Sequence, residues 1–256
     1  MNILVANDDG IQAKGIAKLT EALSLAGHDV YVIAPNGQRS ASSHAISIGK
    51  DILLRQAGGY PFAKEAYMVD GTPADCVKMG VGFLEKKGVH TDMVYTGINH
   101  GGNLGTDTMY SGTVSAAAEG AFLGIPAVAV SVDSHTPQHF ETACKAAVCV
   151  LQEAYQTGGR QSVVSINAPD LPESEIKGMR AAKLGNVKYD EWFFEAKRTE
   201  DSVTYHYAGT AVEDESWEDD MDTKLIRDGW VTVSMVKYDL NDYEGLEMIK
   251  NWEAIK

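Results

Sequence analysis

The stretch that decides the fold is Met1-Asn2-Ile3-Leu4-Val5-Ala6-Asn7-Asp8-Asp9-Gly10. It begins as an apolar run and ends in an amide, two adjacent carboxylates and a glycine. In an open α/β sheet the carboxyl ends of the strands form the ligand crevice, so a buried strand that ends this way predicts a binding site. Neighbouring carboxylates resist ionisation unless a cation lies between them, which favours Mg²⁺ or Mn²⁺ at Asp8 and Asp9. A surface turn explains the same polar residues equally well.

Composition limits the class of protein and its partners. The chain has 256 residues, of which 44% are hydrophobic and 23% charged, as in an ordinary globular protein. Its 36 acidic residues outnumber the 22 basic ones, and the net charge of -14 argues against a nucleic acid or an anionic membrane as partner. A small phosphorylated ligand is still compatible, since a metal ion and backbone N–H groups supply positive charge locally.

The sequence also favours a cytoplasmic enzyme. Its three cysteines, Cys76, Cys144 and Cys149, are an odd number without a CxxC pair, so a disulfide scaffold is not expected. Met1 runs directly into a strand with no positively charged leader, and no apolar segment has the length of a membrane span.

The first two strands predict a parallel sheet. Residues 15–25 place Ile16, Leu19 and Leu23 at helical spacing, and residues 29–34 form a second apolar run that Pro35 closes. Strand, helix and strand in this order form a βαβ unit with a right-handed crossover. The GxGxxG fingerprint is missing from its first turn, so an enzyme that binds NAD or S-adenosylmethionine is disfavoured.

The loop after the second strand, residues 35–44, carries hydroxyls, amides and a guanidinium at the same sheet edge. Ser40 is a candidate metal ligand here, and Arg39 or His44 a candidate phosphate contact. For most of these side chains an ordinary polar loop is the favoured interpretation.

The strand at residues 92–96 ends in a second exceptional stretch, residues 97–105, which holds four glycines and two asparagines. Glycines let the backbone approach a ligand closely. Asn99 supplies a neutral oxygen of the kind that completes a carboxylate-bound divalent ion. The position directly after an apolar strand favours a site over a merely flexible loop.

A helix start follows at Ser111, Gly112 and Thr113. Ser111 or Thr113 would cap a helix of small residues, and the exposed N–H groups of a helix start bind anions. An ordinary N-cap is the alternative, but the adjacent glycine loop favours a phosphate site.

Past residue 171 the strand–helix alternation ends. We expect a catalytic core at residues 1–172 and, packed on it, an extension at 173–256 with antiparallel strands and a helix from Tyr243. The acidic stretch at residues 213–222 is expected to be a solvated loop.

Five segments together resemble one family, because they occur in its characteristic order and spacing. They are NDDGIQAKGI (7–16), APNGQRSAS (34–42), GTPADCV (71–77), GINHGGNLG (97–105) and SGTVSAAAEG (111–120). The sequence resembles the SurE family of stationary-phase survival proteins, which are metal-dependent nucleotidases. The resemblance implies a Rossmann-like three-layer α/β fold with a mainly parallel sheet and a smaller C-terminal β arm and helix used in homodimers or homotetramers. It further implies hydrolysis of nucleoside 5′- and 3′-monophosphates, and of short polyphosphate in some members, with one divalent ion, Mg²⁺ or Mn²⁺, per subunit.

Matched position by position, the family's metal ligands fall on Asp8, Asp9, Ser40 and Asn99. Its phosphate contacts fall on Asn99, Ser111, Gly112 and Thr113, so that Asp8, Asp9 and Asn99 form the expected catalytic set. There are departures, notably Gly102 where many members carry proline, and Ser234-Met235 in place of a Thr-Pro pair.

The sequence therefore predicts a phosphomonoesterase, with three rivals. In a phosphatase of the haloacid-dehalogenase type the two carboxylates are separated by one intervening residue, whereas Asp8 and Asp9 are adjacent. A non-catalytic nucleotide or metal sensor on the same scaffold stays open, and a NAD- or S-adenosylmethionine-dependent enzyme is the third. His100 and His44 are candidates for a general acid.

Overall fold

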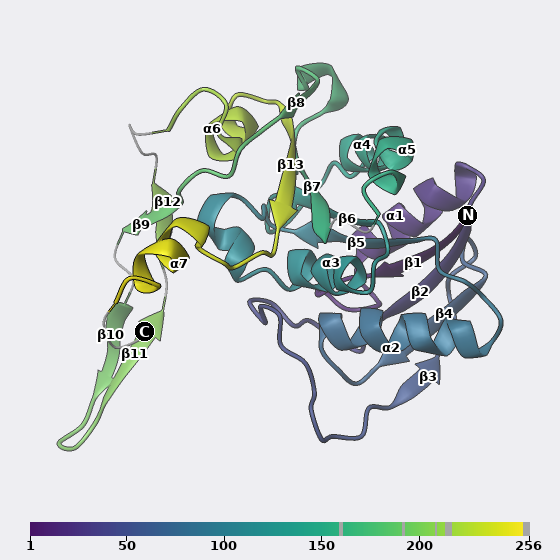
Figure 1. The fold of residues 1–256 in the computed structure, drawn as a ribbon, viewed down its shortest axis with the longest axis horizontal. Coiled ribbons are helices and arrows are strands. Elements are labelled where there is room, and N and C mark those ends of the chain that lie inside the picture. Colours follow the sequence, from purple (N-terminus) through teal and green to yellow (C-terminus); the bar gives the residue numbers. More distant parts are fainter. Residues whose placement is uncertain (159–160, 191–192, 208, 213–216, 253–256) are drawn as a thin grey trace.

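The centre of the molecule is a nine-stranded, mainly parallel sheet (Figure 1). The computed structural model describes residues 1–158, 161–190, 193–207, 209–212 and 217–252. The strands of the sheet are β1 (Asn2–Ala6), β2 (Asp29–Pro35), β3 (Leu54–Gln56), β4 (Glu65–Val69), β5 (Met93–His100), β6 (Ala127–Asp133), β7 (Ser162–Pro169), β8 (Met179–Ala181) and β13 (Val231–Lys237). Their order is β3-β4-β2-β1-β5-β6-β7-β13-β8, and only the β3–β4 and β7–β13 pairs are antiparallel.

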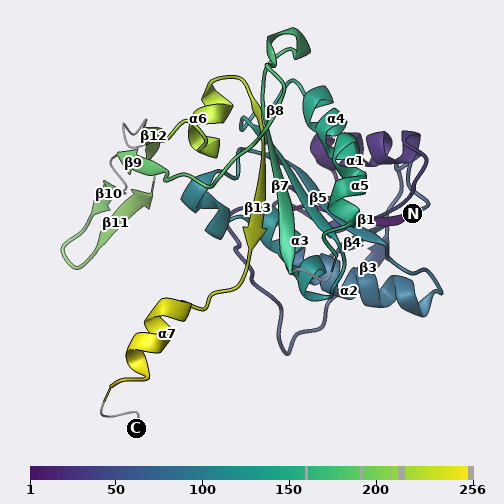
Figure 2. The ribbon, with the colours of Figure 1, turned by 45° about the horizontal axis from the view of Figure 1, so that its top comes forward.

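Helices cover both faces of this sheet (Figures 1 and 2). One face carries α1 (Lys14–Leu25), α4 (Glu141–Cys149) and α5 (Leu151–Tyr155), and the other carries α2 (Pro73–Lys86) and α3 (Gly112–Phe122). Two 3-10 turns, Gly105–Met109 and Glu173–Glu175, and the short helices α6 (Asp222–Arg227) and α7 (Tyr243–Ile249) complete the helical elements. The predicted three-layer α/β fold is confirmed.

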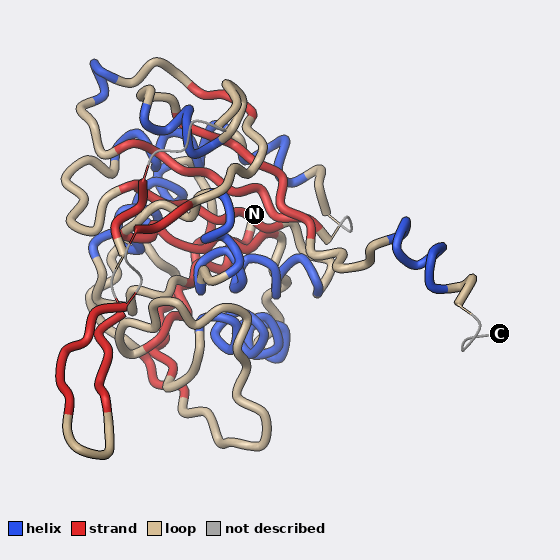
Figure 3. The backbone as a smooth tube through the Cα atoms, turned by 90° about the vertical axis from the view of Figure 1, so that its left-hand side faces the viewer, coloured by secondary structure: helices blue, strands red, loops and turns tan. Residues whose placement is uncertain are grey.

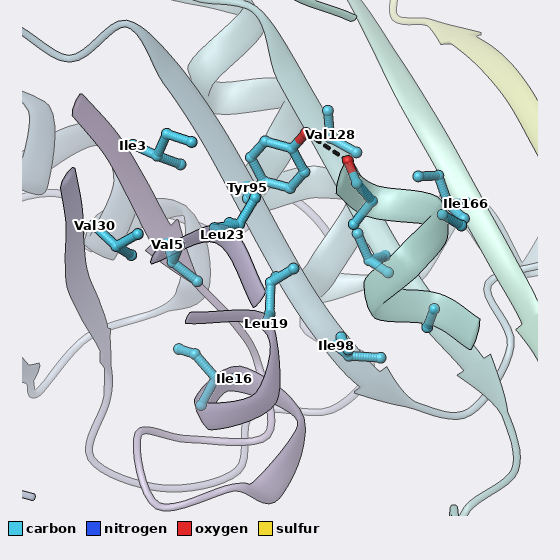
Figure 4. Close-up of a cluster of buried hydrophobic side chains, with 14 of the residues drawn as sticks. Ile3, Val5, Ile16, Leu19, Leu23, Val30, Tyr95, Ile98, Val128 and Ile166 are labelled. Atoms are coloured by element: carbon cyan, nitrogen blue, oxygen red, sulfur yellow. Dashed lines mark hydrogen bonds between the residues drawn. The ribbon is translucent and has the colours of Figure 1, made fainter. Parts of the chain in front are cut away.

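The core explains why these segments take these places. Ile16, Leu19 and Leu23 recur at helical spacing on α1 and are fully buried against β1 and β5 (Figure 4). Tyr95 on β5 is the largest fully buried side chain, and its hydroxyl donates to the carbonyl of Ala147 on α4 at 3.0 Å. That bond satisfies the one polar atom of a side chain that otherwise contributes only apolar surface.

The strand order places the site. β1 pairs with β2 on one side and with β5 on the other, both parallel. The chain runs from β1 to β2 on one side and later returns to the other side of β1 at β5, so the strand order reverses at this point. At such a switch point the loops after the two central strands diverge and open a crevice. The residues that follow β1 and those that end β5 therefore border the same space.

The C-terminal extension contributes to the sheet and also leaves it. β13 lies between β7 and β8, so the sheet itself crosses the expected boundary at residue 172, and that division stays a prediction. A small arm is formed by β9 (Lys188–Asp190) with β12 (Thr210–Val212) and by the antiparallel pair β10 (Phe193–Arg198) and β11 (Val203–Tyr207). The β10–β11 hairpin and α7 both project away from the body (Figures 2 and 3). In the part of the chain described, no helix combines the length and the hydropathy needed to cross a membrane.

Candidate active site

Asp8 emerges from β1 into a buried, hydrogen-bonded position. Its side chain is only 4% exposed, and the hydroxyl of Thr113, which is fully buried, donates to its carboxylate. Burial, helped by the neighbouring charge of Asp9, raises the pKa of Asp8 to about 6 although the hydroxyl and the backbone N–H of Thr113 both lower it. The carboxylate therefore lies at the N-terminus of α3, where the helix dipole favours negative charge.

Asp9 is held by β5, the strand that lies beside β1. Its carboxylate accepts a 3.0 Å hydrogen bond from the backbone N–H of His100, the last residue of β5. Burial raises the pKa of Asp9, while His100 and His135 lower it. Two adjacent carboxylates that are both held in place and both resist ionisation would be stabilised by a cation between them.

The loop after β2 is drawn against Asp8. Gly10 has φ +96°, and a Cβ on it would lie 2.9 Å from the backbone of Gly37, so only glycine allows this approach. The backbone N–H of Arg39 donates to the carbonyl of Asp8 at 2.7 Å. Ser40, the next residue, borders the same cleft as Asp8, and its hydroxyl accepts from the Gln38 amide at 2.9 Å.

Asn99 lies within β5 rather than in the loop beyond it. The pairing of β5 with β6 shifts register between Thr96 and Asn99, which turns this residue toward the cleft. Its amide nitrogen donates to the carbonyl of Gly101 at 2.8 Å. The side-chain carbonyl oxygen is therefore the atom suited to a cation.

The start of α3 closes the site. The Ser111 hydroxyl caps the helix by accepting from the N–H of Val114 at 3.0 Å. A Cβ on Gly112 would lie 2.9 Å from a carboxylate oxygen of Asp8 and 2.8 Å from the Ser42 hydroxyl, so glycine is needed for this contact. Thr113 directs both its hydroxyl and its N–H to Asp8, and so acts on the site through that carboxylate.

The site opens into one cleft of about 490 Å³, a size that suits a small-molecule ligand. Of the residues predicted from sequence, Asp8, Ser40, Asn99, His100 and Ser111 line it directly. Asp9, Gly112 and Thr113 are not among the lining residues, and neither is His44. The sequence interpretation missed other lining residues, namely Asp107, Tyr110, His135, Tyr189 and Tyr207. The two last come from β9 and β11 of the C-terminal arm, which therefore forms part of the cleft wall.

The three histidines near the site have different surroundings. His44 pairs with Glu119 on α3 at 2.9 Å, seven residues beyond Gly112. The ring of His100 packs against Phe140, with 5.6 Å between the ring centroids. His135, in the loop after β6, lines the cleft and an adjoining cavity of about 440 Å³. His100 and His135 therefore border the cleft, whereas His44 is held against α3.

Asp222 contradicts the expectation that residues 213–222 form a solvated loop. Residues 213–216 lie outside the described part of the chain, but Asp222 begins α6 and is fully buried, so the expectation of a solvated residue is wrong there. Its carboxylate accepts from the N–H groups of Gly105 at 2.9 Å and of Gly185 and Thr223 at 2.8 Å each. It thereby joins the glycine loop to the C-terminal extension.

The chemistry of the site follows from its donors. Among the described residues, no three of His, Cys, Asp and Glu gather as a metal site, so a cation here would use the carboxylates of Asp8 and Asp9 together with neutral oxygens. Ser40 and Asn99 offer those oxygens at the same cleft, and the residues present therefore fit a hard divalent ion. Fold and site together define a Rossmann-like α/β protein with a candidate cation- and phosphate-binding cleft.

The chain belongs to the SurE family, because the sequence model described as "Survival protein SurE" matches residues 3–191. A "5'-nucleotidase SurE" of Stenotrophomonas maltophilia (strain R551-3) is 39% identical over 256 residues, covering 98% of this chain and 95% of that protein. A "5'/3'-nucleotidase SurE" of Proteus mirabilis (strain HI4320) is 38% identical over 253 residues, covering 98% and 96%. The crystal structure of the SurE protein from Aquifex aeolicus matches with a TM-score of 0.84 at 33% identity over 98% of each chain. The predicted family and fold are confirmed.

Proposed function

We propose that this chain is a metal-dependent phosphomonoesterase that hydrolyses nucleoside 5′- and 3′-monophosphates to nucleoside and phosphate. The observation that carries the proposal is that the carboxylate of Asp8, the neighbour of Asp9 in the chain, lies in one cleft at the N-terminus of α3. Its relatives are named as 5′- and 5′/3′-nucleotidases, which supports this substrate class and disfavours a non-catalytic sensor.

One divalent ion, Mg²⁺ or Mn²⁺, would be held by Asp8, Asp9, Ser40 and Asn99. When bound, such an ion supplies Lewis-acid polarisation of a phosphoryl oxygen and lowers the pKa of a water. The residues of the chain do the positioning. Thr113 holds Asp8 in place by its hydroxyl, and the backbone of His100 holds Asp9.

The phosphate would lie at the start of α3. The N–H groups at the start of an α-helix attract anions. In α3 those of Val114 and Thr113 are directed to Ser111 and Asp8, so the N–H of Gly112 is the donor that we propose for a phosphate oxygen. Ser111 borders the cleft at the same point. Such donors stabilise the oxygens as charge develops on them during P–O cleavage.

The test is phosphate release from a panel of 5′- and 3′-nucleoside monophosphates and one aryl phosphate, with Mg²⁺, Mn²⁺ or EDTA. We expect release that EDTA abolishes and that Asp9→Asn lowers by at least about a hundredfold. Asp51→Asn is the matched control, because Asp51 is an exposed carboxylate that does not line the cleft. Wild-type turnover by Asp9→Asn at saturating metal would refute the assignment of Asp9 to the metal site. The absence of turnover with every substrate would refute the proposal that the chain is an enzyme.

We also propose that the chain forms a homodimer or homotetramer. No residue of α7 is buried, and its large apolar side chains Leu246 and Met248 are 41% and 67% exposed, so this helix offers an apolar surface to a second subunit. Every residue of β10 is exposed as well. Light scattering on the wild type and on Leu246→Asp tests this, since a monomeric wild type would contradict it. The cytoplasmic location expected from the sequence stays a prediction.

A further inference from the structure

The segment that carries Ser40 has a conformation that needs support. We call residues 40–45 the Ser40 arc. Within it Ala41 has φ +51° and Ser43 has φ +49°. Non-glycine residues rarely adopt this left-handed region, because Cβ comes too close to the following carbonyl oxygen. Two such residues in one short segment persist only when contacts elsewhere hold the chain in place.

The first contacts that hold the arc are backbone bonds at its surface. Ser43 donates its N–H to the carbonyl of Tyr110 at 3.1 Å and its hydroxyl to the carbonyl of Met109 at 2.9 Å. Ser43 itself is exposed, so water competes for both bonds. These bonds tie the arc to the segment just before α3 but do not reach the body of that helix.

The deeper anchor is the pair His44–Glu119. Glu119 lies in the middle of α3 with its side chain only 6% exposed, and one carboxylate oxygen is 2.9 Å from Nε2 of His44. The other oxygen accepts from the ammonium of Lys78 on α2 at 2.7 Å. The imidazole also stacks on Phe122, with ring centroids 5.4 Å apart and planes 7° apart. His44 is therefore held by both a polar contact and an aromatic one.

Packing alone does not explain a buried glutamate at position 119. Removing a carboxylate from water is costly, and an apolar residue of similar size would pack at least as well beside Phe122. What the carboxylate adds is a directed contact to one residue of the arc, on the same helix whose first turn borders the cleft. The Ser42 hydroxyl lies only 2.8 Å from the point where a Cβ on Gly112 would stand, so the arc packs directly against the start of α3.

We propose that Glu119 and His44 are positioning residues that fix the Ser40 arc over α3 and so place Ser40 in the cleft. The consequence for metal binding rests on the proposed function, whereas the fixing of the arc does not. This assigns His44 a role remote from the phosphate. It also predicts that the pair acts as a unit, so that losing both partners costs no more than losing one.

The test compares His44→Ala, Glu119→Gln and the double variant with the wild type, and Lys78→Ala is the matched control. Lys78 binds the same carboxylate as His44 but lies on α2, outside the arc. The first readout is hydrogen exchange of the amides at residues 41–45 in metal-free protein. The second is the Mn²⁺ concentration that gives half-maximal phosphate release.

We expect His44→Ala to speed exchange of the arc amides by at least about tenfold and to raise the Mn²⁺ requirement by a similar factor. Lys78→Ala should stay within about twofold of the wild type in both readouts, and His44→Gln, which can still donate to Glu119, should recover part of the loss. His44→Ala with wild-type exchange and wild-type Mn²⁺ requirement would overturn the proposal. So would Lys78→Ala with the same effects as His44→Ala, because the defect would then follow the buried charge and not the arc.

The two proposals fail in distinguishable ways. If the wild type releases phosphate from no substrate, the proposed function fails while the exchange data still decide whether the pair fixes the arc. Unchanged exchange in an active His44→Ala enzyme leaves the function intact and removes the positioning role.

Discussion

Thr113→Val removes the hydroxyl that donates to Asp8 and leaves almost everything else in place. Valine has nearly the shape of threonine, and the bond from the Thr96 hydroxyl to the carbonyl of residue 113 is unaffected by the exchange. Both partners of the lost bond are buried, with Thr113 fully buried and Asp8 4% exposed, so water does not replace the donor. A hydrogen bond to a charged group contributes about 1.5–3 kcal/mol to stability, and we expect a loss of about 2 kcal/mol in the free energy of unfolding. For a chain of this length that corresponds to a fall in Tm of about 4–8 °C.

The assay is thermal unfolding in EDTA, so that no metal contributes to the stability, followed by phosphate release with saturating Mn²⁺. Thr113→Ser is the control, because it keeps the hydroxyl and loses only a methyl group, at a cost of about 1 kcal/mol. We expect Thr113→Val to lose activity and Thr113→Ser to retain most of it, since only valine removes the hydroxyl that donates to Asp8, whereas both variants keep the backbone N–H. If Thr113→Val melts with the wild type, or if Thr113→Ser is the less stable of the two, the bond does not hold Asp8 in place.

Three further outcomes are expected. Asp222→Ala leaves the buried N–H groups of Gly105 and Gly185 without their acceptor, at about 1–3 kcal/mol each, and urea unfolding should show this loss while the exposed control Asp228→Ala shows almost none. Burial alone would raise the pKa of Asp75, but hydrogen bonds from Ser47 and Thr72 outweigh it and hold the pKa below its usual range. Because the pKa of Asp75 is lower in the folded state than in the unfolded chain, this stabilisation is fully present above the unfolded-state pKa and is lost as the pH falls through the folded-state pKa. Asp75→Asn should therefore be less stable than the wild type at neutral pH and should approach it in acid. An equal difference in stability at both pH values would be the contrary result. Mn²⁺ at about 100 times its Kd should raise the free energy of unfolding of the wild type by about 2.7 kcal/mol in calorimetry, and an equal rise in Asp9→Asn would argue against the metal site.

The sequence predicts the sheet edge well because the signal there is local. An apolar run that ends in polar residues shows both the strand and the place where its side chains face solvent, and the rule that parallel strands share a carboxyl edge brings distant loops together. Asp8, Ser40, Asn99 and Ser111 were predicted in this way, and the structure gathers them at one cleft. Their assignment as metal and phosphate ligands stays a prediction.

The residues that sequence reasoning missed are those without a local pattern. Tyr189 and Tyr207 reach the cleft from the C-terminal arm, and short exposed strands carry no periodicity that shows where they fold back. Asp222 looked like one more charge in an acidic run, because burial by the glycine loop is a tertiary event. His135 had a usable signal, since it follows the buried strand β6 as Asp8 follows β1, and the same rule applied there would have found it.

A single helix supports the site from two directions. Thr113, in the first turn of α3, holds Asp8, and Glu119, further along it, contacts the arc that carries Ser40. A hydroxyl on a mobile loop would lose conformational entropy each time it bound a cation, whereas a loop already tied to a helix has lost that entropy on folding. The spacing of Thr113 and Glu119 along a rigid helix therefore sets the separation of a carboxylate and a hydroxyl that the sequence places more than thirty residues apart. On this reasoning, weakening either contact should lower the affinity for a cation in a protein that still folds, because neither bond belongs to the packing between α3 and the strands.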